Sequence, residues 1–155
     1  MQNKRKALRL GIFWALAIGW IAVLFYFSGQ TAAESSALSS SVANFVRGIF
    51  PFNRIPSGQL EHVLRKLAHF VIFGLEGLLL GLAMMQSVGK LRVGALLSAV
   101  ACGALAAANE LHQRFFEGRS CEGGDVLIDS AGALLGIAVA ALAYFLCRRR
   151  RRDRR

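Results

Sequence analysis

The chain has 155 residues, 55% of them hydrophobic and only 18% charged, and its formal net charge is +10. Several apolar runs reach the roughly 20 residues with which a helix crosses a hydrocarbon core about 30 Å thick. These properties exclude an ordinary soluble protein, and a chain of this length favours a single domain. We therefore predict an all-α polytopic membrane protein in which residues 1–155 form one domain with four transmembrane helices.

The basic residues lie at the ends of apolar runs. Residues 148–155 (RRRRRDRR) directly follow one run, and Lys4, Arg5, Lys6 and Arg9 directly precede another. Cytoplasmic segments of membrane proteins carry such an excess of Lys and Arg, which also attracts anionic lipid headgroups. We predict a basic cytoplasmic tail at 148–155. Because no nucleic-acid recognition motif accompanies the charge, we do not expect nucleic acid as a partner.

The first span is predicted at about residues 11–27. Its basic lead and the small residues at 31–33 also fit a cleavable signal peptide, which is the alternative interpretation. The apolar run is longer than the ~7–15 residues of a signal peptide, and this favours a retained helix.

Residues 28–61 form a Ser-rich connection. Within it, five apolar residues recur at helical spacing before Pro51: Val42, Phe45, Val46, Ile49 and Phe50. This spacing predicts a short helix that lies in the outer membrane interface. A surface loop is the alternative.

The second, third and fourth spans are predicted at about residues 62–85, 93–111 and 125–147. Four spans that begin in the cytoplasm also end there. Under this topology, thirteen of the 19 Lys and Arg residues are cytoplasmic and six are outside. The asymmetry supports an orientation with both termini in the cytoplasm.

Six polar residues from three spans fall near the same outer boundary. They are Lys66, His69, Glu110, Gln113, Asp125 and Asp129. Ionisable side chains are costly at bilayer depth, so by default they face the interior of a bundle and mark a functional site. We therefore predict a polar pocket that opens to the outer face. Phe73 and Glu76 continue the helix stripe of Lys66 and His69, with Glu76 ~15 Å deeper than Lys66.

On two other helices, small residues lie on the same helix stripe as a carboxylate. These stripes are Asp125, Asp129, Gly132 and Gly136 on one helix, and Glu110, Ala106 and Gly103 on another. Small residues let neighbouring helices approach closely. Each helix is therefore predicted to combine a charged upper part with a close-packing lower part.

Several carboxylates with a histidine suit a hard divalent cation, or acid–base work on a phosphate ester. We take Glu110, Asp125 and Asp129 as bases or metal ligands. The sequence leaves the cofactor open, with a divalent cation as the candidate. His69 is their acid–base partner. The sequence contains no HExxH, GxSxG or P-loop signature, and it leaves open whether the protein is an enzyme.

Four further residues are predicted to bind the substrate. Lys66 and Arg119 suit an anionic group, since Arg binds phosphate oxygens in bidentate fashion. Gln113 and His112 lie beside Glu110, although His112 points away from it if the helix continues. A site at this depth favours a lipid headgroup or a lipid-linked envelope precursor, which the protein is expected to bind or chemically modify.

Two other interpretations remain. In the first, the polar cluster is a salt-bridge network that only fastens the helices of a non-enzymatic membrane module, with Asp125 as a helix N-cap. Ion or proton transport would use Glu76, but no continuous polar path crosses the lower half of the bundle.

The motifs resemble those of the VanZ-like family of small bacterial membrane proteins over roughly residues 10–147. They are Phe27-Ser28-Gly29-Gln30, Arg65-Lys66-Leu67-Ala68-His69-Phe70, Glu110-Leu111-His112-Gln113, Gly118-Arg119, and Asp125-Val126-Leu127-Ile128-Asp129 with Gly132 and Gly136. The namesake of this family is associated with low-level resistance to teicoplanin, a glycopeptide with a lipid tail. The resemblance implies a multi-pass protein of the bacterial plasma membrane, with membrane lipids, lipid-linked envelope precursors or a lipoglycopeptide as partners.

Overall fold

The computed structural model describes residues 2–50 and 55–152, and within these residues it is all-helical. The helices are α1 (Gln2–Ser28), α2 (Ala32–Ile49), α3 (Ser57–Val88), α4 (Leu91–Gln113) and α5 (Gly123–Arg152). Helices α1, α3, α4 and α5 are each long and apolar enough to cross a membrane. The prediction of an all-α, multi-span membrane protein is thus confirmed, and each of these four helices extends beyond its predicted span at both ends.

The connection between the first two spans is the helix α2, so the surface-loop interpretation is wrong there. Thr31 begins it with a capping box: its side chain accepts a hydrogen bond from the Glu34 backbone, and the Glu34 carboxylate accepts one from the Thr31 backbone at 2.8 Å. This box satisfies N–H groups that a helix start leaves free. It explains why the helix begins well before the apolar spacing at 42–50 predicted. Pro51 lies outside the described residues.

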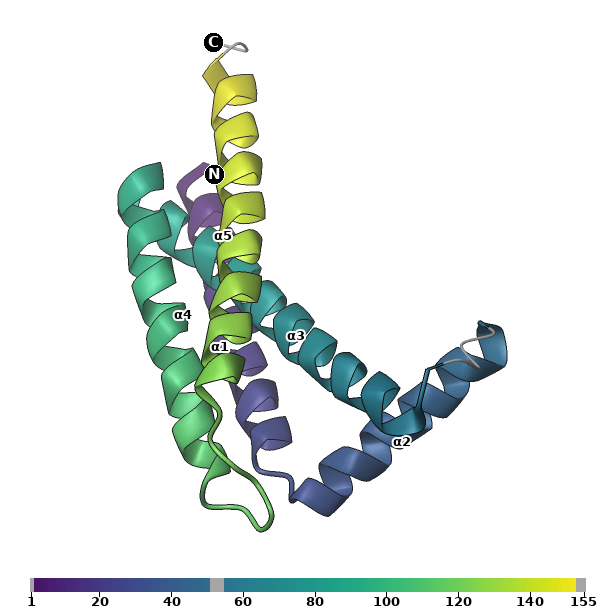
Figure 1. Ribbon diagram of the computed structural model, residues 1–155. Coiled ribbons are helices and arrows are strands. Elements are labelled where there is room, and N and C mark those ends of the chain that lie inside the picture. Colours follow the sequence, from purple (N-terminus) through teal and green to yellow (C-terminus); the bar gives the residue numbers. More distant parts are fainter. Residues whose placement is uncertain (1, 51–54, 153–155) are drawn as a thin grey trace.

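Helix α3 is the centre of the fold, because it packs against α1, α2, α4 and α5. Figure 1 shows α1, α4 and α5 running in roughly the same direction, and α4 packs against both α1 and α5. Helix α3 crosses them obliquely, and α2 extends away with the first turns of α3 (Figure 1). The N-terminal end of α1, the C-terminal end of α5 and the α3–α4 turn lie at one end of the bundle. The α1–α2 turn and the α4–α5 loop lie at the other end (Figure 1).

Glycines allow α3 and α5 to cross at very short distance. A Cβ atom at Gly132 would overlap the Phe70 carbonyl, and one at Gly136 would overlap the Gly74 carbonyl. Close approach at the Gly132–Gly136 stripe was predicted, and α3 is the helix that makes it. The corresponding prediction for Gly103 on α4 is wrong, since a Cβ there would meet nothing within 4 Å. Backbone contact of this kind replaces the hydrophobic driving force that is missing between helices in lipid.

Helix α1 is attached to α3 by its two indole groups. Trp14 Nε1 donates to Ser87 Oγ at 3.0 Å, and Trp20 Nε1 donates to the Ile72 carbonyl at 2.9 Å. A Trp N–H that leaves water needs an acceptor. These two bonds therefore set the height of α1 relative to α3.

Glu76 lies in the core of the bundle at 0% exposure, and neither carboxyl oxygen has a hydrogen-bond partner among the described residues. Because an unsatisfied buried polar group is costly, an apolar side chain of similar shape should be more stable there. We expect Glu76→Met to raise the free energy of unfolding by about 1–3 kcal/mol. Thermal unfolding in detergent measures the change. Exposed Glu117 supplies the control, since Glu117→Met should change stability by only about 0.5 kcal/mol.

A lower stability of Glu76→Met would contradict this expectation. It would indicate a bound ion or proton at Glu76, which the transport interpretation requires.

Candidate functional site

The predicted site residues come together at the end of the bundle opposite the termini. This end contains the end of α1, the first half of α3, the end of α4, the α4–α5 loop and the start of α5. The loop is held by a hydrogen bond of 3.0 Å from the Ala32 N–H to the Glu117 carbonyl. The next residue, Gly118, has a φ of +71°, a backbone conformation that favours glycine. This turn brings Arg119 toward the helices.

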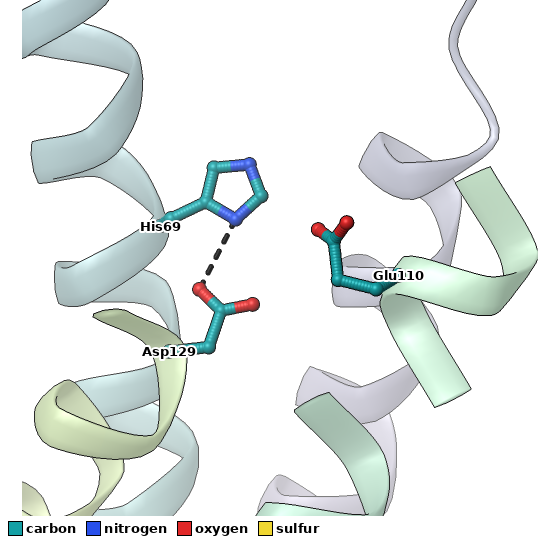
Figure 2. Close-up of side chains that lie close together, drawn as sticks. All are labelled: His69, Glu110 and Asp129. Carbon is teal, nitrogen blue, oxygen red and sulfur yellow. Dashed lines mark hydrogen bonds and ion pairs between the residues drawn. The ribbon is translucent and has the colours of Figure 1, made fainter. Parts of the chain in front are cut away.

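Three ionisable side chains from three helices form the centre of the site. They are His69 of α3, Glu110 of α4 and Asp129 of α5, and one potential ligand atom from each lies within 4.8 Å of the others. Figure 2 shows the three side chains pointing toward one another. His69 Nδ1 lies 3.1 Å from Asp129 Oδ1. Glu110 and Asp129 are buried, with 1% and 0% of their surface exposed.

Each carboxylate of this cluster keeps one oxygen without a protein partner. Glu110 Oε2 accepts a hydrogen bond of 2.9 Å from the Glu122 backbone, but Glu110 Oε1 has no partner in the described part of the chain. Asp129 Oδ1 faces His69, and Asp129 Oδ2 has no partner there either. Buried polar atoms are normally satisfied, so each exception requires an explanation. A ligand bound between these two oxygens would explain why both lack a protein partner.

Asp125 and Lys66 form a separate ion pair beside this cluster. The Lys66 ammonium bonds to Asp125 Oδ1 and lies 3.6 Å from Glu122 Oε2. Asp125, predicted as a third metal ligand, is thus directed toward Lys66, and His69 takes its place beside the other two carboxylates. Asp125 is also not the N-cap of α5, because the helix begins at Gly123.

A cavity of about 240 Å³ adjoins the cluster. Its apolar wall comes from α1, α2 and α3, with Leu24, Phe27, Leu38, Val42, Leu64, Ile72 and Phe73. Its polar wall includes His69, Asn109, Gln113, Arg65 and Arg119. His69 therefore belongs both to the buried cluster and to the cavity wall.

Two arginines face this cavity, and only one of them was assigned a binding role from the sequence. Arg65 Nη2 donates to Ser36 Oγ at 3.3 Å. The pKa of Arg119 is lowered by its burial and by the neighbouring Arg65 guanidinium, although Glu110 and Asp125 partly offset this. Neither guanidinium forms an ion pair within the residues that the structure describes. The position of Arg65 directly before Lys66 on the same helix was the available signal.

The two remaining predicted residues differ in position. Gln113 is 4% exposed and lines the cavity. His112 lies on the other side of α4, where its Nδ1 is 3.1 Å from Ser28 Oγ and its ring packs against Phe25 and Phe116. His112 thus joins α1 to α4 and does not face the cluster. Sequence reasoning missed Asn109 as a cavity residue, although it lies one turn before Gln113.

The VanZ/LLP1 family model matches residues 13–145. The chain belongs to the VanZ-like family. No curated protein and no solved structure matches it. The matched range contains the α3–α5 crossing, the buried cluster and both cavity arginines, so the whole site lies within the VanZ-like part of the chain.

Proposed function

We propose that this VanZ-like membrane protein binds the phosphate-bearing headgroup of a membrane lipid, or of a lipid-linked envelope precursor, in the cavity beside His69. The observation that carries this function is the pair of arginines at one cavity. Arg65 and Arg119 both face it, and neither has a carboxylate partner among the residues described. Two guanidinium groups held together repel each other, and a bound anion relieves that repulsion.

The chemistry of the two walls fits a lipid. Guanidinium groups bind phosphate oxygens with two parallel hydrogen bonds. Leu38 and Val42 of α2 and Leu64 of α3 offer an apolar surface for the chain that carries the phosphate. Ligand sites of this kind combine a mostly apolar lining with a few convergent polar groups.

The proposed location is the bacterial plasma membrane, with both termini in the cytoplasm. This orientation follows from the basic residues at both ends of the chain and directs the cavity to the outer side. Lipid-linked envelope precursors are exposed on that side. A lipoglycopeptide such as teicoplanin also has a lipid tail, so we propose the same cavity for it and a role for the protein in teicoplanin resistance.

Native mass spectrometry of the detergent-released protein tests the proposal. The wild type should retain a phospholipid or polyprenyl-phosphate species. Arg119→Gln should lower the affinity for this species by about 10- to 150-fold, because a charge-assisted hydrogen bond contributes about 1.5–3 kcal/mol. The matched control is Arg114→Gln in the same loop, where the arginine is exposed and lies outside the cavity lining.

Equal lipid retention by the wild type and a folded Arg119→Gln variant would contradict headgroup binding. The alternative would then be the non-enzymatic module whose polar cluster fastens the bundle. The same variants can be expressed in a teicoplanin-sensitive strain. Resistance conferred by the wild type and by Arg114→Gln, but not by Arg119→Gln, would connect the cavity to the drug.

A further inference from the structure

We infer that His69, Glu110 and Asp129 form a binding site for one divalent transition-metal ion, Zn²⁺ or Mn²⁺. The inference rests on the buried cluster and goes beyond headgroup binding, since the arginines that carry that proposal are not part of it. The three residues come from three different helices, α3, α4 and α5. A metal at this point would therefore join α3, α4 and α5.

The donor set matches such an ion. Zn²⁺ takes imidazole nitrogen and carboxylate oxygen at about 2.0–2.2 Å, which places tetrahedral ligand atoms about 3.3 Å apart. His69 Nδ1 and Asp129 Oδ1 lie 3.1 Å apart, and the three ligand atoms lie within 4.8 Å of one another. Small side-chain rotations of Glu110 would complete the site. Mn²⁺ accepts the same mixture with a stronger preference for carboxylate.

A second observation points to a ligand. Glu110 Oε1 and Asp129 Oδ2 are buried and have no hydrogen-bond partner in the described residues. Within the cluster, only the His69 ring is directed at a carboxylate, and it contacts a single oxygen. The nearby Arg119 guanidinium interacts electrostatically with Glu110 but forms no ion pair with it among the described residues. A divalent cation between the two buried carboxylates would compensate their charge directly.

The Lys66 ammonium contacts carboxylates outside the cluster. It is bonded to Asp125 and lies 3.6 Å from Glu122. Lys66 and Asp125 therefore form an ion pair of their own beside the cluster of His69, Glu110 and Asp129.

Three protein ligands leave a coordination position open, as in catalytic zinc sites and unlike closed structural sites. His69 also lines the cavity, so a metal on its Nδ1 would lie next to the ligand bound there. A metal ion binds neutral imidazole and ionised carboxylates, so metal affinity should fall as the pH is lowered.

Metal content tests the inference. The full-length protein is purified in detergent, stripped with a chelator, incubated with Zn²⁺ or Mn²⁺ alone and desalted, and its metal is measured by inductively coupled plasma mass spectrometry. We expect about one ion per folded chain. Asp129→Asn and Glu110→Gln should each lower the affinity at least about tenfold. Glu76→Gln is the matched control. Glu76 is equally buried, and its carboxyl oxygens have no hydrogen-bond partner in the described residues, but it lies outside the cluster.

Fluorescence-detected gel filtration establishes that each variant is folded before its metal is counted. A folded wild type that holds no stoichiometric ion overturns the inference, as does equal metal binding by wild type, Asp129→Asn and Glu110→Gln. Lipid occupancy is measured on the same samples. Metal without retained lipid rejects the headgroup proposal alone, and retained lipid without metal rejects the metal site alone.

Discussion

Gly136→Ala is expected to abolish the native packing of α3 against α5. A Cβ atom at this position would overlap the Gly74 carbonyl and would lie 2.7 Å from the Leu78 amide nitrogen. Both obstacles are backbone atoms, so no side-chain rotation relieves the overlap and the helices must separate. Overpacking a well-packed core costs about 1–3 kcal/mol, and we expect the upper part of this range or more.

Gly103→Ala is the matched control for this substitution. Gly103 is also a helical glycine in a membrane span, but its Cβ would enter open space. Alanine is the better helix former, so this variant should be as stable as the wild type or more stable by about 0.5–1 kcal/mol. Thermal unfolding followed by circular dichroism in detergent compares the two. A Gly136→Ala variant with the wild-type melting temperature would show that the crossing is wider than described.

Lys66→Met is expected to destabilise the protein by about 2–4 kcal/mol, because it removes the ammonium that is bonded to Asp125 and lies near Glu122. Asp125→Asn should cost less, since Lys66 keeps Glu122 at 3.6 Å. The side chains of Lys66 and Asp125 are 28% and 16% exposed. Water therefore reduces the destabilisation below that expected for a fully buried ion pair.

A double-mutant cycle measures the coupling within this pair. The variant with both Lys66→Met and Asp125→Asn should be more stable than the sum of the two single changes implies. Lys90→Met serves as the control, because Lys90 is exposed and has no ion pair among the described residues. Additive effects would indicate that Lys66 and Asp125 act independently, and the fastening interpretation of the polar residues would lose its main interaction.

Much of the fold follows from the chain's own pattern. Apolar run length determines the four spans, because a bilayer admits only segments whose backbone polar groups bond internally. Helical periodicity correctly directs Phe73 and Glu76 to the interior, and it separates His112 from Glu110, two positions about 200° apart on a helix. The Gly132–Gly136 spacing correctly indicates a close helix contact. The same reasoning fails at Gly103, since a small residue permits close approach without requiring it.

The pairing of polar residues was decided by tertiary structure. Sequence spacing determines which residues share a face of one helix, but it does not determine how neighbouring helices are rotated, tilted or shifted along their axes. These relations bring His69 to Asp129 and Glu110, and they direct Lys66 to Asp125. The sequence alone established that carboxylates, a histidine and basic residues meet at one end of a membrane bundle. Only the crossing of α3 over α5, through contacts between backbones, sorted them into an ion pair, a buried cluster and a cavity with two arginines.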